Sequence, residues 1–407
     1  MASMGGGDKP ALKLRRLQEL DVEGKRVLMR VDFNVPLKGS TITDSTRIRE
    51  TIPTLKHLLQ AKARVVLISH LGRPKGKPEE KYSLKPVVKE LEKLSGVRVH
   101  FGSDCVGEAA DKAVSAGGPG EIVLLENLRF HAGEEKNDPE FSKLLARHGE
   151  VFVQDAFGAL HRAHASTSGV AKLLPGGIGL LVQKELEFLD RVIGNPERPF
   201  LAILGGAKVS DKLAVVLRLL DRVDTLLIGG GMSFTFLHAQ GISIGNSLLE
   251  KERVPDAQGI IEKAYAKDVE LLLPADHIIV KEIKEGAENQ VSQGMAVPEG
   301  LIGVDIGPRS IEIFSEKIAQ AKTIFWNGPM GVFEIPDFAK GSLSVARALA
   351  KATSKGSVTI VGGGDSLAVL AQSKLARKMS HCSTGGGASL ELLEGRILPG
   401  LAALSQS

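Results

Sequence analysis

The stretch VTIVGGGDS, residues 358–366, decides the fold class of this chain. A short β-branched run ends in three glycines, and Asp365 and Ser366 then open an apolar helical pattern. Main-chain N–H groups that glycine leaves uncovered, together with the positive end of a helix, form a cradle for phosphate. The alternative is a tight strand-to-helix turn in which Asp365 or Ser366 is only the N-cap. Taken alone, the stretch favours that alternative, because glycine-rich turns of this kind are common in α/β folds.

Similar strand-length apolar runs alternate with helical patterns from Lys25 onward. In the first half they cover residues 26–31, 63–69, 121–127 and 150–156. In the second half they cover residues 199–204, 224–229, 270–275, 322–327 and 357–362. This alternation is typical of parallel sheets covered by helices, so the expected class is α/β, with two Rossmann-like three-layer domains.

Helix signals separate these runs. Ser83 is expected to cap a helix that stops at Gly96. Asp138, followed by a proline, is expected to open another helix that stops at Gly149. Residues 180–193, LLVQKELEFLDRVI, form an amphipathic pattern followed by Gly-Asn-Pro.

This last pattern predicts a helix that connects two domains. We therefore expect an N-terminal domain at residues 10–178 and a C-terminal domain that begins at residue 179. The two halves share an architecture without a strong sequence repeat.

Composition limits the classes of function. At 407 residues the chain can bury about two cores, and its 43% hydrophobic and 25% charged residues are typical of a globular protein. The net charge of +4 and the 4% aromatic content make a nucleic-acid partner unexpected. No apolar run approaches the length of a membrane span and no signal-peptide pattern opens the chain, so no membrane partner is expected.

The cysteines and the N-terminus add two further expectations. Cys105 and Cys382 lie far apart and form no CxxC or metal-ligand motif, so reduced thiols in the cytoplasm are the simplest interpretation. The first residues, MASMGGGDKP, are small and polar, which is typical of a loose tail.

Candidate site residues follow the strands, because ligands of open α/β sheets bind beyond the carboxyl ends of the strands. In the first half these residues are Asp32, Asn34, His70, Arg73, Arg129, His161 and Arg162. In the second half they are Lys208, Lys212, Gly229 to Gly231, Asn327, Glu334, Asp365 and Ser366.

The arginines of the first half suit a small ligand that carries phosphate and carboxylate, because each guanidinium grips two oxygens. Any one of them alone is better interpreted as a solvated surface residue, and a lone loop histidine as a hydrogen-bonding residue. Several in one topological position, with His70 and His161 among them, favour an anion site.

The lysines of the second half bracket Ser210, the expected cap of a helix that carries Leu213 and Val216. Positive charge in the first turn of a helix opposes the macrodipole, at a cost of roughly a few tenths of a kcal/mol. An anion held between Lys208 and Lys212 would offset this cost, although Asp211 could also offset it locally.

Several known nucleotide motifs are absent. The sequence contains no GxxxxGK[ST] and no protein-kinase signature set. GGGMSF and GGGDSL lack the GxGxxG spacing of a dinucleotide fingerprint, although each turn, like the glycines 385–387, stays compatible with a nucleotide.

Longer blocks identify a family. They include RVDFNVP, TRIR, SHLGRP, LLENLRF, DAFGALHRAHAS, GGAKVSDK, WNGPMGVFE, VGGGDS and STGGGASLELLEG. In this order, over about residues 25–400, they resemble phosphoglycerate kinase.

The resemblance implies a monomeric, cytoplasmic, hinge-bending enzyme of glycolysis and gluconeogenesis. It would transfer a phosphoryl group reversibly from 1,3-bisphosphoglycerate to ADP, giving 3-phosphoglycerate and ATP, with Mg²⁺ as cofactor. Phosphoglycerate would bind the N-terminal domain, and the nucleotide would bind the C-terminal domain at residues 179–392. The connecting helix would carry the hinge, and residues 393–407 would pack back on the N-terminal domain.

The resemblance also implies roles for individual residues. Arg47, Lys208 and Lys212 would be catalytic, with Arg47 at the reacting carboxyl group. The phosphoglycerate-binding residues would be Asp32, Phe33, Asn34, Arg47, His70, Arg73, Arg129 and Arg162. The nucleotide-binding residues would be Gly206, Lys208, Lys212, Gly230, Gly303, Asn327, Glu334, Gly363, Gly364, Asp365 and Ser366, with Asp365 also linked to Mg²⁺.

Three segments depart from the family pattern, and the third, residues 367–378, is expected to form a helix rather than a site. Ala159 and Leu160 stand where smaller or hydroxylated residues are usual, and LIGVDIGP, residues 301–308, replaces a Trp-Met-Gly-Leu type of segment. The second departure leaves the purine-side contacts open and the phosphate chemistry unchanged.

Two other classes of function stay open at this point. A nucleotide-cofactor oxidoreductase would bind NAD rather than ADP, although the dinucleotide fingerprint is missing. A non-catalytic anion-binding scaffold would bind phosphoglycerate without turnover, although Lys208, Lys212 and Asp365 are all present.

Overall fold

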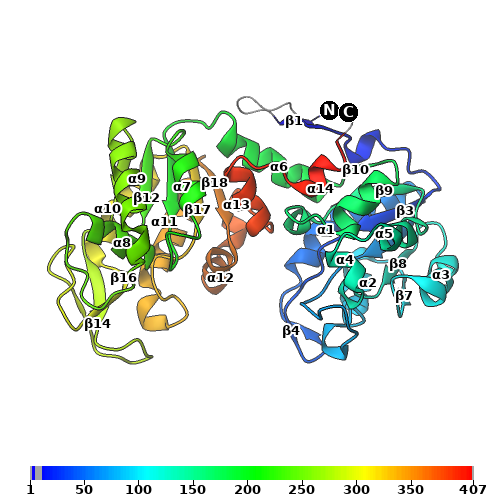
Figure 1. The fold of residues 1–407 in the computed structure, drawn as a ribbon, viewed down its shortest axis with the longest axis horizontal. Coiled ribbons are helices and arrows are strands. Elements are labelled where there is room, and N and C mark those ends of the chain that lie inside the picture. The colour runs from blue at the N-terminus through cyan, green and yellow to red at the C-terminus, as the bar shows by residue number, and fades with distance from the viewer. Residues whose placement is uncertain (1, 5–11, 406–407) are drawn as a thin grey trace. The chain divides into compact units, whose positions relative to one another are not determined.

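The computed structural model describes residues 2–4 and 12–405, which fall into two compact units (Figure 1). The first unit runs to Glu187 and takes in the segment from Arg396, and the second is Phe188–Gly395. Helix α6 (Leu180–Ile193) begins in the first unit and ends in the second. No helix in the described ranges combines the length and the apolar character needed to cross a bilayer.

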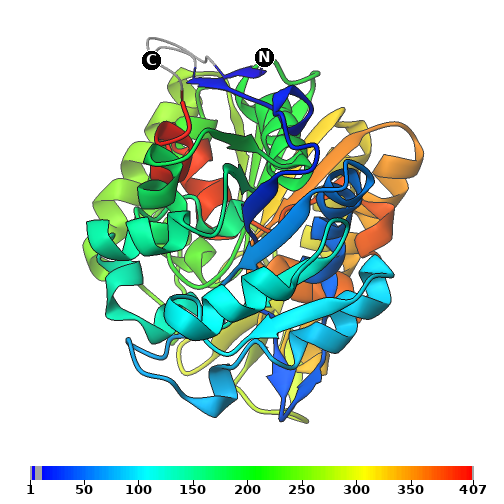
Figure 2. The same cartoon turned by 90° about the vertical axis from the view of Figure 1, so that its right-hand side faces the viewer.

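A six-stranded parallel sheet forms the centre of the first unit (Figure 2). Its order is β10 (Gly176–Ile178), β9 (Val151–Gln154), β3 (Arg26–Arg30), β6 (Arg64–Ile68), β8 (Ile122–Leu125) and β7 (Val99–Gly102). Every residue of β8 and β9 is buried, so both faces of the sheet are covered. The four predicted strands are confirmed; the edge strands β7 and β10 were not predicted, because VHFG and GGI carry little apolar pattern.

Helices of the first unit lie between these strands. They are α1 (Thr46–Gln60), α2 (Val87–Ser95), α3 (Gly107–Ala116), α4 (Ala132–Glu135), α5 (Pro139–Ala146) and α14 (Pro399–Ala402). Asp138 caps α5, as predicted, by accepting from Phe141 N at 2.8 Å. The predicted cap at Ser83 is wrong, because the Ser83 hydroxyl donates to Glu126 Oε2 at 2.6 Å and α2 begins only after Pro86.

The ends of the chain add to this unit. Strand β1 (Ala2–Met4) pairs antiparallel with β2 (Leu12–Leu14), so the expectation of a loose tail is wrong for these three residues; residues 1 and 5–10 lie outside the described ranges. In the C-terminal segment, Gly400 N donates to Leu160 O at 3.0 Å and Leu401 is buried. Strands β4 (Leu37–Lys38) and β5 (Thr41–Ile42) form a small hairpin.

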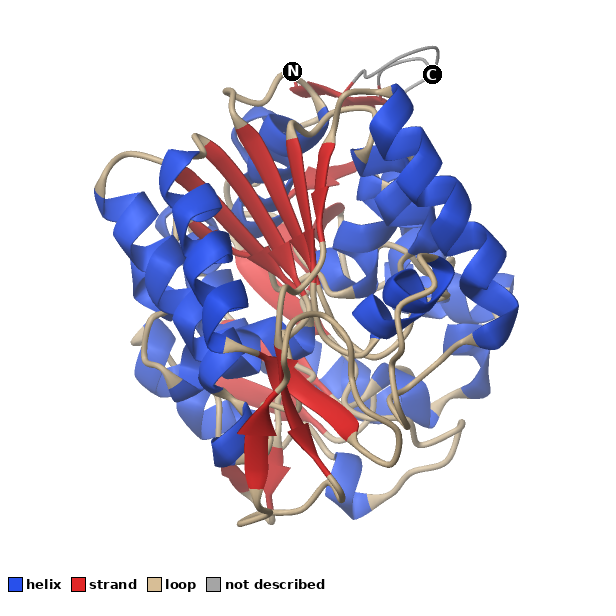
Figure 3. Ribbon diagram, turned by 90° about the vertical axis from the view of Figure 1, so that its left-hand side faces the viewer, coloured by secondary structure: helices blue, strands red, loops and turns tan. Residues whose placement is uncertain are grey.

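The second unit repeats the design, with helices on both faces of a parallel sheet (Figure 3). The strand order is β13 (Glu270–Leu272), β12 (Thr225–Ile228), β11 (Phe200–Leu204), β17 (Thr323–Asn327), β18 (Val358–Gly362) and β19 (His381–Cys382). The helices are α7 (Leu213–Leu219), α8 (Met232–Ala239), α9 (Val254–Ala266), α10 (Pro308–Gln320), α11 (Lys340–Ser354), α12 (Gly364–Gln372) and α13 (Gly387–Leu393). All five strands predicted in this half are confirmed, and the short edge strand β19 is additional.

A three-stranded antiparallel sheet is the unpredicted part of this unit. Strand β14 (His277–Val280) lies between β15 (Asn289–Val291) and β16 (Ile302–Ile306). Val280, Val304 and Phe338 form its small core. The sheet matters for function because residues of β14 and β16 line a large pocket in this unit.

Candidate active site

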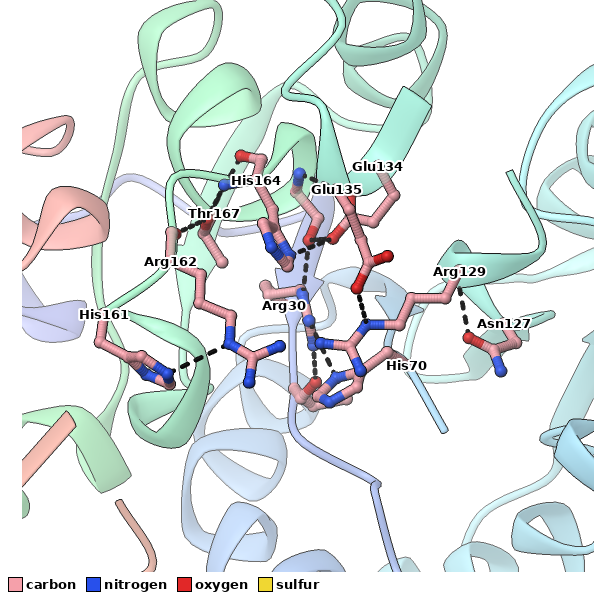
Figure 4. A network of polar contacts seen from close by, with 12 residues as sticks. Arg30, His70, Asn127, Arg129, Glu134, Glu135, His161, Arg162, His164 and Thr167 are labelled. Atoms are coloured by element: carbon pink, nitrogen blue, oxygen red, sulfur yellow. Dashed lines mark hydrogen bonds and ion pairs between the residues drawn. The ribbon is translucent and has the colours of Figure 1, made fainter. Parts of the chain in front are cut away.

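Arg30 is the centre of a polar network in the first unit (Figure 4). This side chain at the end of β3 is 1% exposed. Its Nε donates to Ser166 Oγ at 2.7 Å, its Nη1 donates to Val31 O, and its Nη2 lies 3.1 Å from His70 Nδ1. Burial lowers the pKa of His70 well below its usual value, with Asp32 opposing and Arg30 adding to the effect. His70 is therefore neutral, and its Nδ1 accepts from Arg30.

Asp32 follows the same strand and keeps its charge. Its Oδ2 accepts from Arg47 Nη1, and its Oδ1 accepts from Asn34 N at 3.1 Å. Burial by itself would raise the pKa of Asp32, but Arg47 and the other nearby cations outweigh it and lower this pKa to about 2. The result is an ionised carboxylate beside a partly exposed guanidinium.

The loop after β6 joins Asn34 to Arg129. Asn34 Oδ1 accepts from Gly72 N at 2.9 Å, and Arg129 Nη1 donates to Gly72 O at 2.7 Å. Phe33 is buried, and its N–H donates to Ser69 Oγ at 2.8 Å. These bonds fix the backbone on which the predicted substrate residues stand.

Arg129 and Arg162 bring further positive charge to the network (Figure 4). Arg129 is 5% exposed, and its Nε lies 3.5 Å from Glu135 Oε1. Burial and the nearby Arg162 lower the pKa of Arg129 to about 10. Arg162 Nε donates to His161 Nε2 at 3.1 Å. Two guanidinium groups near enough for one to lower the pKa of the other favour an anion beside them.

Glu134 positions Arg30 through Ser166. It is fully buried, accepts from Ser166 N at 3.0 Å and from Ser166 Oγ at 2.6 Å, and lies 3.6 Å from His164 Nδ1. The Ser166 hydroxyl therefore donates to Glu134 and accepts from Arg30. This chain of bonds orients Arg30 and, through it, His70.

A pocket of about 470 Å³ lies in the second unit. Its apolar wall includes Phe234, Leu248, Ile302 and Met330. Gly206, Gly230, Gly303, Glu334 and Asp365 also line it. An apolar wall with a few polar groups is typical of a small-molecule site.

Lys212 stands beside this pocket, next to Gly206. Its Nζ donates to Asn327 O at 3.3 Å and to Asn327 Oδ1. Burial lowers the pKa of Lys212 to about 8, and the nearby Asp365 opposes that shift. Lys212 is thus a cation that a phosphate would stabilise further.

Glycines make room for Lys212 and Asn327. Gly328 and Gly363 have positive φ angles of 97° and 91°. A Cβ on Gly328 would lie 2.9 Å from Lys212 Nζ, and one on Gly363 would lie 2.8 Å from Asn327 Nδ2. Side chains at these positions would both strain the backbone and displace the polar groups.

Lys208 has a different environment. It is exposed in the loop before α7, and Glu250 holds that loop by accepting from Ser210 N at 3.1 Å and from Ser210 Oγ. The backbone is therefore fixed while the ammonium group is in solvent.

Comparison with known proteins assigns the chain to a family. The family model described as phosphoglycerate kinase matches residues 17–396. The chain belongs to the phosphoglycerate kinase family.

Individual relatives agree with this assignment. The chain is 54% identical to the phosphoglycerate kinase of Elusimicrobium minutum, over 97% of this chain and 99% of that protein. It is also 54% identical to phosphoglycerate kinase 3, cytosolic, of Arabidopsis thaliana, over 96% of this chain and 98% of that protein. The structure of phosphoglycerate kinase from Coxiella burnetii is similar with a TM-score of 0.85 at 43% identity, over 96% of this chain and 99% of that one. The resemblance seen in the sequence is thereby confirmed.

In this member of the phosphoglycerate kinase family, three predictions about where helices begin are wrong. The N-cap of α12 is Gly363, so Asp365 lies in the first turn and Ser366 is buried, with its Oγ accepting from Gly328 N at 2.6 Å. Ser210 does not cap α7, whose N-cap is Lys212. Lys208 consequently lies outside the first turn of that helix.

The structure brings together most, but not all, of the predicted phosphoglycerate-binding residues. Asp32, Asn34, Arg47, His70, Arg129 and Arg162 are linked through hydrogen bonds and electrostatic contacts. Arg73 is exposed and makes none of these contacts. Arg30 and Glu134 were missed, although an arginine inside an apolar strand run was a usable signal.

Proposed function

We propose that this chain is a phosphoglycerate kinase that transfers a phosphoryl group reversibly between 1,3-bisphosphoglycerate and ADP. The observation that carries the proposal is the pocket of about 470 Å³ in the second unit, whose apolar wall is continued by glycine backbone, Asp365 and the neighbouring Lys212. Membership in the family supports the reaction.

The nucleotide assignment follows the chemistry of the pocket. Phe234, Leu248 and Ile302 suit the faces of a purine base, and the exposed Glu334 carboxylate suits ribose hydroxyls. Gly206 and Gly230 line the pocket without a side chain, so phosphates can approach the backbone there. Their own N–H groups donate to Pro329 O at 2.9 Å and Met330 O at 3.1 Å, which fixes this backbone. Gly303, Asn327, Gly363 and Gly364 complete the proposed nucleotide site. Ser366, which is buried and accepts from Gly328 N, would position that site without contacting the nucleotide through its hydroxyl.

The phosphoglycerate assignment uses the network around Arg30. Ionised Asp32 can accept from a substrate hydroxyl, while Arg129 and Arg162 bind the phosphate. Arg47, which is partly exposed, would meet the reacting carboxyl group. Phe33, Asn34, His70 and Arg73 complete the proposed set.

The chemistry requires no general base. The attacking oxygen belongs to an ionised ADP phosphate in one direction and to a carboxylate in the other. Transfer instead needs in-line positioning and positive charge around the equatorial oxygens, which Arg47, Lys208 and Lys212 supply.

Asp365 fits a magnesium ion by its chemistry. Its carboxylate is exposed, lines the pocket and acts electrostatically on Lys212. Mg²⁺ prefers oxygen ligands and is commonly bound through one or two carboxylates together with substrate phosphates. Bound there, Mg²⁺ would neutralise charge on the phosphate oxygens during transfer.

We also propose that the two units close about a hinge, because each unit would bind one substrate and transfer requires contact between the two substrates. The protein would act as a monomer in the cytoplasm. The cytosolic relative in Arabidopsis thaliana supports the compartment. Light scattering of the purified protein tests the monomer.

A coupled assay tests the function. Purified protein should form ATP from ADP and 1,3-bisphosphoglycerate only with Mg²⁺. Lys208→Ala and Arg47→Ala should each lower turnover about a hundredfold. Lys355→Ala, an exposed lysine at the end of α11, is the control and should leave turnover unchanged. Phosphoglycerate binding without turnover would show that the protein is a non-catalytic scaffold. Binding of NAD but not ADP would show that it is an oxidoreductase.

A further inference from the structure

A second group of ligand-type side chains lies in the first unit, apart from the network around Arg30. Asp104 and Cys105 belong to the loop between β7 and α3, and His131 precedes α4. One carboxylate oxygen, the Cys105 Sγ and one His131 ring nitrogen all lie within 4.8 Å of one another. No sequence motif indicates this group, because His131 is distant from the cysteine along the chain.

Local contacts hold the three side chains in place. Asp104 Oδ1 accepts from Cys105 N at 2.6 Å and lies 2.6 Å from His131 Nε2. The His131 ring stacks on Phe141, with ring centroids 5.2 Å apart. The Cys105 carbonyl accepts from His148 Nε2 at 3.2 Å. A third bond comes from Val106 N at 3.4 Å, and all three bonds to Asp104 use its Oδ1, so its Oδ2 can bind a metal ion.

Acidic side chains surround Cys105. Asp104, Glu134 and Glu126 all act electrostatically on its thiol. A nucleophilic cysteine needs positive surroundings, since the thiolate is its reactive form. Acidic groups around a thiol instead favour a bound cation.

We propose that Asp104, Cys105 and His131 form a binding site for a divalent transition-metal ion of the Zn²⁺ type, with the fourth position open to water. Sulfur, imidazole and carboxylate are the ligands that Zn²⁺ takes in proteins. Metal–ligand bonds of about 2.0 to 2.3 Å place tetrahedral ligand atoms roughly 3.3 to 3.8 Å apart. The three ligand atoms lie within 4.8 Å of one another, and the hydrogen bond of 2.6 Å between His131 Nε2 and Asp104 Oδ1 would open when the metal binds.

Metal binding exchanges a proton of Cys105 for the metal ion. The S–H bond of Cys105 breaks, its proton passes to solvent, and a metal–sulfur bond forms. The His131 proton moves from Nε2 to Nδ1, which frees Nε2 as a ligand. The side chains of His131 and Asp104 are 32% and 42% exposed, so a hydrated ion can reach them.

The site differs from the proposed magnesium position. Asp365 offers only oxygen, which suits Mg²⁺, whereas this group offers sulfur and nitrogen. A metal here would tie the loop before α3 to the segment before α4, which carries Glu134. We therefore expect it to stabilise the first unit, and the inference does not rest on the proposed function.

Cobalt titration of the metal-free, tag-free, full-length protein tests the site without ADP or phosphoglycerate. One equivalent of Co²⁺ should produce a thiolate-to-metal charge-transfer band, and Zn²⁺ should displace it. Cys105→Ser should abolish the band, whereas Cys382→Ser should retain it, since these are the two cysteines of the chain. Absence of the band in the wild type, or its persistence in Cys105→Ser, would overturn the proposal.

Two further variants keep the test decisive if Cys105→Ser does not fold. His131→Gln and Asp104→Asn alter partly exposed side chains. Each should weaken Zn²⁺ binding at least tenfold and remove the rise in melting temperature that Zn²⁺ gives the wild type. Unchanged Zn²⁺ affinity in both variants would contradict the site, whatever the outcome of the kinase assay.

Discussion

Lys212 donates from its ammonium group to the main-chain oxygen of Asn327, 3.3 Å away, and to the side-chain oxygen of the same residue. The amide nitrogen of Asn327 is buried without a partner. Burial lowers the pKa of Lys212 to about 8. The charge of this lysine thus depends on pH close to neutrality, and Asn327 holds it at the end of β17.

The pH profile of the enzyme should report Lys212. The protonated form binds phosphate, so kcat/KM for ADP should fall as pH rises through about 8, approaching tenfold per pH unit. In Lys212→Arg the guanidinium stays charged, so the remaining activity should lose this decline. Initial rates from pH 6.5 to 9.5 measure both enzymes, and the same decline in both would contradict the assignment.

Gly303→Ala should weaken nucleotide binding selectively. A Cβ at this position would lie 2.2 Å from Phe234 Cζ, so the ring must move within the pocket wall. KM for ADP should rise about tenfold, with KM for 1,3-bisphosphoglycerate unchanged. Gly259→Ala in α9, where a Cβ meets nothing within 4 Å, is the control. Equal KM values for ADP in both variants would show that this contact does not shape the pocket.

Asp155→Asn should change how stability depends on pH. Asp155 accepts from Leu181 N at the start of α6, and burial raises its pKa to about 7. A folded pKa above the unfolded value gives stability that is complete below about pH 4 and is lost as pH rises through about 7. Between pH 5 and 8 the wild type should lose roughly 2 to 3 kcal/mol more than the variant.

Urea unfolding at the two pH values measures this difference. Asp305 in the second unit also has a pKa raised by burial to about 7 and remains in both proteins, so it adds the same decline to each. Equal losses in wild type and Asp155→Asn would show that Asp155 is ionised throughout.

Arg30→Lys should destabilise the first unit. The guanidinium contacts Ser166, His70 and the Val31 carbonyl, and a lysine cannot reproduce this fork. We expect a loss of about 3 kcal/mol in the free energy of unfolding and a higher KM for phosphoglycerate, because His70 loses its donor. Arg73→Lys, at an exposed position, should leave stability unchanged. Thermal unfolding measures the stability of both variants, and steady-state kinetics measures KM for phosphoglycerate in Arg30→Lys.

The accuracy of the sequence predictions followed the strength of the local pattern. Residues 200–204 and 324–326 are continuous apolar runs, and each lies in a central parallel strand. Strands β7, β10 and β19 were not predicted, because their pairing depends on a neighbouring strand more than on their own residues. The antiparallel sheet was missed for the same reason. The contribution of β14 to the pocket was missed with it, and so was that of every β16 residue except Gly303.

Cap positions were harder to predict than the elements themselves. Asp138 caps α5 as expected, whereas Ser83 and Ser210 bond to Glu126 and Glu250, which are distant in sequence. A hydroxyl near a helix start has several possible acceptors, and the chain's path decides which one is in reach.

The sequence by itself determined the α/β class, most of the strands, the family and the polar residues that follow the strands. These features depend on local periodicity and on motif order, both of which are present in one dimension. The stretch 358–366 is an example, since its strand and glycine turn are evident from the residues alone.

Only the tertiary structure decided which of those residues meet. It made Gly363 the cap of α12, turned Ser366 inward to Gly328, and placed Arg30 and Glu134 on either side of Ser166. It also brought His131 to Cys105. Hydrogen bonds and ion pairs act over a few ångströms, so distant residues interact only after the chain has packed, and burial then sets their charge.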